Sequence, residues 1–147
     1  MSPKTVVSKE ILAHDLRTAL HGKLDNERID HAVRSLATTT ASYPANGSVA
    51  SLIFYLQFQV TITSPGGKAF NGIAGGLSIP GGGPLFGDVL TDNINALYAN
   101  THGLAFTATP AYLAIYFYDS SSNYLGAFQS VAVSTVLGTG GGTGSWS

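Results

Sequence analysis

The sequence predicts an all-β fold, a closed antiparallel barrel of about eight strands built from two Greek-key motifs. It also predicts a short N-terminal arm that is either helical or disordered. Three observations support this class. Residues 51–63 alternate between apolar and more polar side chains, which is the period of a strand with one buried face. Residues 112–118 alternate in the same way, and turn residues separate the extended stretches between them.

The composition fits one domain, because 147 residues with 44% hydrophobic content can bury a core without disulfides. The net charge of -1 provides no basic field for nucleic acid, so no nucleic-acid partner is expected. The chain has no cysteine and therefore no thiolate metal site. Its first residues include no apolar run of the length of a signal peptide or a transmembrane helix, so either the chain is cytosolic or a leader is missing.

The arm is set apart by its charge. Residues 1–36 hold six of the seven Lys and Arg residues and five of the eight Asp and Glu residues. This shift predicts a charged arm and linker over residues 1–44 and a glycine-rich barrel over residues 45–147. Apolar residues recur at helical spacing and predict two short amphipathic helices, the second capped by Asp25 or Asn26. Short isolated helices are marginal, so a disordered arm stays open as an alternative.

The barrel is expected to begin late, because Thr38–Ser48 is small, polar and interrupted by Pro44 and Gly47, which is typical of a linker. The strand over Ser51–Thr63 then has six large apolar residues on its predicted buried face: Leu52, Phe54, Leu56, Phe58, Val60 and Ile62. A turn at Ser64–Lys68 leads into a return strand that ends at Ile79, so a hairpin is predicted.

Two halves of the chain, offset by about sixty residues, follow the same order of alternating strand, turn, return strand and triple glycine. Residues 80–84 predict a turn, 85–90 a short strand and 92–99 a helical turn capped by Thr91 or Asp92. Strands are expected over 103–109, 112–118 and 124–137. The glycine run at 138–144 is interpreted as a connection to a final edge strand at 145–147.

The sequence predicts no catalytic, cofactor or metal site. His102 is the one histidine of the barrel region, and no Gly-x-Ser-x-Gly motif accompanies it. An acid–base pair of His102 with Asp88 or Asp92 is a weaker interpretation than a structural histidine. The order Asp119-x-Ser121-x-Asn123 resembles the start of a calcium loop, but it lacks the glycine and the distant Glu, so a hairpin turn is favoured.

A candidate contact surface is predicted on the outward phase of the two long strands. It contains four tyrosines: Tyr55, Tyr112, Tyr116 and Tyr118. Such side chains suit contact with a partner protein or a membrane interface. The alternative is cross-strand pairing of tyrosines on a solvated sheet, and the pattern leaves both interpretations open.

A further set of motifs occurs in a distinctive order: the hairpin turn, AGG, PGGG, TDxxxxLY and the C-terminal GSW. In this order, residues 64–98, 111–136 and 138–147 resemble the virulence-associated protein (Vap) family of intracellular actinobacterial pathogens. The resemblance implies a closed barrel of two Greek keys that the bacterium secretes and that acts in the host phagosome. No enzymatic activity is agreed for this family, so the resemblance gives no reason to expect one.

From this resemblance we expect a secreted, non-enzymatic virulence effector that acts in the macrophage phagosome or endolysosome, or at the bacterial surface. The expected partner is a host protein or a membrane surface, without a cofactor, and the protein is expected to be a monomer. The alternative is a small-ligand barrel of lipocalin type, which the large inward aromatic residues disfavour. An enzyme would need a cleft with convergent polar groups.

Overall fold

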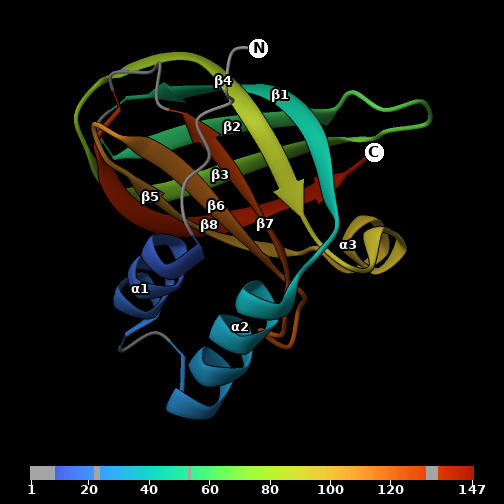
Figure 1. Cartoon of the computed structure of the whole chain (residues 1–147). Helices are drawn as coiled ribbons and strands as arrows, with labels where there is room; N and C mark the ends of the chain where they lie inside the picture. Colours follow the sequence, from blue (N-terminus) through green and yellow to red (C-terminus); the bar gives the residue numbers. More distant parts are fainter. Residues whose placement is uncertain (1–8, 22–23, 53, 132–135) are drawn as a thin grey trace.

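The computed structural model describes residues 9–21, 24–52, 54–131 and 136–147 and shows a closed barrel with helices on its outside (Figure 1). The strands are β1 (Ser42–Ser51), β2 (Tyr55–Ile62), β3 (Ala69–Ser78), β4 (Gly81–Leu90), β5 (Gly103–Ala108), β6 (Tyr112–Tyr118), β7 (Tyr124–Val131) and β8 (Gly138–Trp146). The helices are α1 (Lys9–Leu20), α2 (Asn26–Thr38) and α3 (Ile94–Asn100). The prediction of an eight-stranded antiparallel barrel with a helical N-terminal region is confirmed.

The strands follow the order β1-β2-β3-β8-β5-β6-β7-β4 around the barrel, and each neighbouring pair is antiparallel. In each half of the chain the fourth strand lies beside the first: β4 pairs with β1, and β8 pairs with β5. This 4-1-2-3 arrangement is the strand order of a Greek key. The β3–β8 and β4–β7 pairs join the two halves and close the barrel.

The interior of the barrel is filled by side chains. In β2, every second residue from Leu56 to Ile62 is buried, as the alternation predicts. The rings of Phe58 and Phe106 have centroids 5.1 Å apart, and those of Phe70 and Phe117 are 4.9 Å apart. This packing takes the space that a lipocalin-type ligand would need, so the structure gives that alternative no support.

The buried face predicted for residues 51–63 is wrong at its first two apolar positions. Leu52 and Phe54 are 74% and 70% exposed, because the chain turns between β1 and β2 instead of continuing as one strand. The backbone N–H of Leu52 donates to the carbonyl oxygen of Tyr55 at 2.8 Å and closes this turn. The two side chains therefore project from the end of the barrel rather than into it.

The linker predicted at Thr38–Ser48 is also wrong for most of its length, since β1 begins at Ser42. This strand pairs with β2 on one side and with β4 on the other. A Cβ at Gly47 would collide with the backbone of Gln59, so the glycine permits close contact between the strands rather than breaking them. The strand carries few large side chains, and its signal in the sequence is weak for that reason.

The glycine runs, predicted as turns, lie within strands. Gly81–Gly83 open β4, and residues 140–142 are in the middle of β8. The inward positions of β8 leave room for large neighbours: a Cβ at Gly144 would lie 2.5 Å from Cζ of Phe70. The packing of the barrel therefore requires a glycine at position 144 of β8.

The N-terminal helices pack on the outer face of β5, β6 and β7 (Figure 1), and α1 together with α2 is called the helical cap below. The predicted capping by Asp25 is confirmed, because its Oδ1 accepts from the N–H of Arg28 at 2.8 Å. Arg17 of α1 forms an ion pair with Asp30 of α2 at 2.8 Å. The cap of α3 is Asn93 rather than the predicted Thr91 or Asp92.

Candidate functional site: contact surfaces

The predicted tyrosine surface is covered by the helical cap. Tyr112, Tyr116 and Tyr118 are 4%, 0% and 7% exposed, so the expectation that they form an open face is wrong. Their outward direction is correct, but apolar residues of the cap pack over them: Leu12, Leu16, Leu20, Ile29, Ala32 and Leu36. Tyr55, the fourth predicted tyrosine, is 40% exposed and lies on another side of the barrel.

The cap places these tyrosines, with Tyr124 of β7, in an apolar environment. Burial raises the pKa of Tyr116, Tyr118 and Tyr124, so these phenols stay protonated through neutral and mildly alkaline pH. The hydroxyl of Tyr116 donates to the carbonyl oxygen of Leu12 at 3.3 Å. Within the described chain, the buried hydroxyls of Tyr112, Tyr118 and Tyr124 have no hydrogen-bond partner.

One feature of the sequence could have revealed this covered face. Residues 112–118 read YLAIYFY, so neither phase of β6 contains an amide or a charge. In β2, by contrast, Gln57 and Gln59 mark the solvent side. A continuous apolar run is typical of a strand with both faces buried.

A second surface is formed by exposed apolar side chains at one end of the barrel, where the β1–β2 and β3–β4 turns lie side by side. We call it the apolar end: Leu52, Phe54, Tyr55 and Ile79. Their exposed fractions run from 40% to 74%. The two turns are linked by a hydrogen bond of 3.2 Å between the hydroxyls of Ser51 and Ser78. No charged residue occurs in the sequence between Ala37 and Gly67, or between Ala69 and Gly87.

A third surface adjoins the apolar end on the outer face of β1, β2, β3 and β8. An open groove of about 710 Å³ follows these strands. The exposed side chains that line it carry no charge: Ser48, Ala50, Gln57, Gln59, Asn71, Ile73 and Thr143. Amide and hydroxyl groups of this kind donate and accept hydrogen bonds without changing protonation state near neutral pH.

The candidate acid–base residues Asp88 and Asp92 accept hydrogen bonds from other strands and segments of the chain. Asp88 accepts from Nε2 of Gln129, and Asp92 accepts from the N–H groups of Thr40 and Ala41. His102 lies in a different cleft, of about 230 Å³, whose lining includes Leu20 and Tyr118. Across the described residues, no group of three or more His, Asp or Glu side chains is close enough to hold a metal ion.

The Asp119 motif forms a hairpin turn, as favoured over a calcium loop. Oδ1 of Asp119 accepts from the N–H groups of Ser121 and Asn123, at 2.9 Å and 2.8 Å. Burial raises the pKa of Asp119, but these hydrogen bonds, a bond from the Asn123 amide and the charge of Arg28 outweigh it. The pKa of Asp119 therefore lies below its ordinary value.

A family model described as "Rhodococcus equi virulence-associated protein" matches residues 3–147. The chain belongs to this family. The predicted resemblance is thus confirmed, and a virulence-related role follows for the protein. A search of curated protein sequences found no match. None of the described helices has the length and apolar character required to cross a membrane.

Two solved structures of virulence-associated proteins from the intracellular pathogen Rhodococcus equi are similar to this chain. VapD is 37% identical with a TM-score of 0.71, and the match covers 73% of this chain and 97% of VapD. VapB is 41% identical with a TM-score of 0.67, and the match covers 73% of this chain and 96% of VapB.

Proposed function

We propose that this virulence-associated protein is a secreted, non-enzymatic effector that acts in the host phagosome or endolysosome by surface contact, and that its apolar end makes the contact. Membership of the family supports the virulence role. The observation that supports contact is the exposure of Leu52 and Phe54, at 74% and 70%, in a turn that the barrel holds by backbone hydrogen bonding. Exposed apolar groups held in this way are typical of interaction sites.

The free energy available from this surface is sufficient for reversible binding. Fully burying one large apolar side chain is worth about 1.5–3 kcal/mol, so partial burial of four could contribute roughly 5 kcal/mol. Tyr55, one of the four, has an aromatic ring with a polar hydroxyl, a combination that suits the boundary between water and lipid. The partner is therefore a membrane interface or an apolar patch on a host protein.

The surroundings of the apolar end favour contact that does not depend on charge. The turns that form it lie in stretches without Lys, Arg, Asp or Glu, and the neighbouring groove is lined by neutral side chains. Such a surface is neither attracted to nor repelled by anionic lipid. Binding through it should respond weakly to salt, unlike binding by a basic patch.

Flotation with liposomes tests the membrane form of this proposal. Wild-type protein should float with neutral phosphatidylcholine vesicles and with anionic vesicles, at pH 5 and at pH 7. The partition coefficient of the double variant Leu52→Ser/Phe54→Ser into the vesicles should be lower than that of the wild type by a factor of roughly ten or more. Added salt should leave both results unchanged.

A matched control is the double variant Ile73→Ser/Phe86→Ser, which removes two side chains that are 47% and 50% exposed elsewhere on the barrel. It should float like the wild type. An equal loss for both double variants would show that contact is not specific to the apolar end. Failure of the wild type to float with any vesicle would exclude the membrane form and leave a host protein as the partner.

A further inference from the structure

We infer that the outer face of β5, β6 and β7 is a helix-binding surface, which the helical cap occupies in this structure and which an amphipathic helix of a partner protein binds after the cap detaches. We call this surface the aromatic face: Tyr112, Tyr116, Tyr118 and Tyr124. It is separate from the apolar end, which lies at the β1–β2 and β3–β4 turns.

The aromatic face packs against an apolar stripe on α1. Leu12, Leu16 and Leu20 recur every four residues along one side of α1, and they are 0%, 0% and 3% exposed against the barrel. Residues at this spacing form a stripe on one face of a helix. A partner helix with leucines at the same spacing presents the same stripe to the tyrosine rings.

Two hydrogen bonds between cap and barrel have backbone carbonyl groups as their acceptors. In the described chain, the Tyr116 hydroxyl donates to the carbonyl oxygen of Leu12, and Nε of Arg28 donates to that of Ser121. The bond from Tyr116 therefore needs a helix backbone at this position but no particular side chain. A helix of different sequence can accept the same bond.

The cap does not provide a hydrogen-bond partner for every buried hydroxyl of the aromatic face among the described residues. Tyr112, Tyr118 and Tyr124 each have a buried hydroxyl without a hydrogen-bond partner among the described residues. An unsatisfied buried polar group costs about 1–3 kcal/mol. Water would bond these hydroxyls when the cap leaves, and a partner helix with a polar group placed over them would bind more tightly than the cap does.

The cap is joined to the barrel by a short stretch that belongs to neither the helices nor the strands. Residues 39–41 connect the cap to β1. While this connection is intact, the cap has an effective concentration on the order of millimolar, so a free helix competes poorly.

The test uses the full chain with a specific protease site inserted between Thr39 and Thr40. After cleavage, fluorescently labelled peptides are added and their binding is measured by anisotropy, while release of the cap is followed by size exclusion. Three probes are used. One is the cap peptide of residues 9–38, the second is a designed helix with the leucine stripe of α1 and an unrelated polar side, and the third is the designed helix with serines in the stripe.

We expect the designed helix to bind the cleaved protein with a dissociation constant within about tenfold of that of the cap peptide. The serine probe should bind roughly a hundredfold more weakly or worse. The uncleaved chain should bind neither peptide at the same concentrations. In the uncleaved variant Leu12→Ser/Leu16→Ser, whose cap is weakened, binding of the designed helix should appear without any cut.

Several results would overturn the inference. Binding of the cap peptide but not of the designed helix would show that the face accepts its own cap alone. Equal binding of the leucine and serine probes would exclude recognition of the stripe. Near-ultraviolet circular dichroism of the cleaved barrel shows whether it is folded, and a folded barrel that binds no probe also refutes the proposal. The Leu52→Ser/Phe54→Ser variant should bind the designed helix normally, which separates this result from the contact at the apolar end.

Discussion

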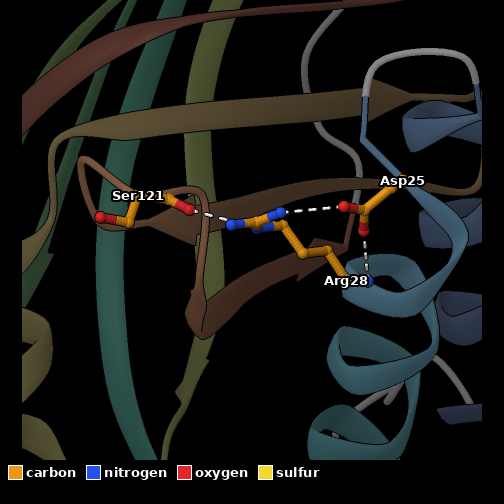
Figure 2. Close-up of polar contacts among 3 residues, drawn as sticks. All are labelled: Asp25, Arg28 and Ser121. Atoms are coloured by element: carbon orange, nitrogen blue, oxygen red, sulfur yellow. Dashed lines mark hydrogen bonds and ion pairs between the residues drawn. The ribbon is translucent and has the colours of Figure 1, made fainter.

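Arg28 of α2 and Ser121 of the β6–β7 turn are 93 positions apart in sequence, and a hydrogen bond of 3.2 Å from the guanidinium Nε to the Ser121 carbonyl oxygen joins them (Figure 2). The same guanidinium lies 2.9 Å from Oδ2 of Asp25, whose other carboxylate oxygen caps the helix. One side chain thus connects the start of α2 to the barrel. The strength of cap docking should depend on it.

Replacement of Arg28 by alanine should loosen the cap and leave the barrel unchanged. The hydrogen bond is partly exposed, so its loss should cost about 0.5–1.5 kcal/mol. Hydrogen exchange should therefore become several times faster at the amides of α1 and α2. Arg34→Ala in the same helix is the control and should have a smaller effect. Equal acceleration throughout β2 and β3 would mean that the cap and barrel open together.

Two phenylalanines four residues apart should differ in how much they contribute to the free energy of unfolding. Phe58→Ala should lower the free energy of unfolding by about 3–5 kcal/mol, because it leaves a cavity against Phe106. Phe54→Ala and Gln57→Ala should be nearly neutral, since both side chains are exposed. Urea unfolding monitored by tryptophan fluorescence measures all three. Similar losses for Phe54→Ala and Phe58→Ala would contradict the turn between β1 and β2.

Two glycines of β3 should differ in how much an alanine at their position destabilises the barrel. A Cβ at Gly72 would lie 2.6 Å from Cε2 of Phe70 and 2.7 Å from Cδ2 of Leu104, whereas a Cβ at Gly75 has its nearest neighbour at 3.9 Å. Gly72→Ala should therefore destabilise the barrel by about 1–3 kcal/mol through overpacking. Gly75→Ala should not destabilise it. Thermal unfolding of the two variants checks this, and a stable Gly72→Ala protein would disagree with the packing of Phe70.

The stability of the fold should depend on pH through Asp119 in the β6–β7 turn. The pKa of Asp119 is lowered in the folded protein, so ionisation of this group stabilises the fold above the ordinary carboxyl value of 3.8, and this contribution disappears as the pH falls through the lowered pKa. The turn should therefore hold at the pH of an acidified vesicle. Asp119→Asn should reduce the melting temperature at pH 7, with the difference from wild type shrinking below pH 3.8.

The control for net charge is Glu27→Gln, which removes one carboxylate from α2. Its melting temperature should differ little from that of the wild type across the same pH range. If the difference between wild type and Asp119→Asn stays constant from pH 7 to pH 2, the hydrogen bonds of the turn do not depend on the charge of Asp119.

The sequence predicted the parts of the fold whose buried positions carry large side chains. Leu56, Phe58 and Ile115 gave clear alternation, and Asp25 gave a clear helix start. Most of β1 and β8 was missed because small residues fill many of their positions, where neighbouring backbones and rings need the space. The end of β8 was predicted as an edge strand at 145–147, but β8 pairs with β3 and β5 and is not an edge. A glycine chosen for close packing looks the same in sequence as a glycine chosen for a turn.

The candidate contact surface was less predictable than the fold. Alternation placed Tyr112, Tyr116 and Tyr118 correctly on the outer face of β6, but it contains no information on what covers that face. The cover comes from helices that lie more than 70 residues earlier in the chain. Leu52 and Phe54 were assigned to the core because a turn of this kind, with apolar side chains, has no glycine or proline to mark it.

The uneven division of charge between cap and barrel has a consequence for solubility. Residues 37–147 contain Lys68, Asp88, Asp92 and Asp119 as their charged side chains, while eleven charged side chains lie in residues 1–36. Charged surface keeps proteins apart in solution. Loss of the cap would therefore remove most of the charges that keep the molecules dispersed, at the same moment that it exposes the tyrosines, and a trimmed barrel should precipitate or adsorb to surfaces at concentrations where the whole chain remains dissolved.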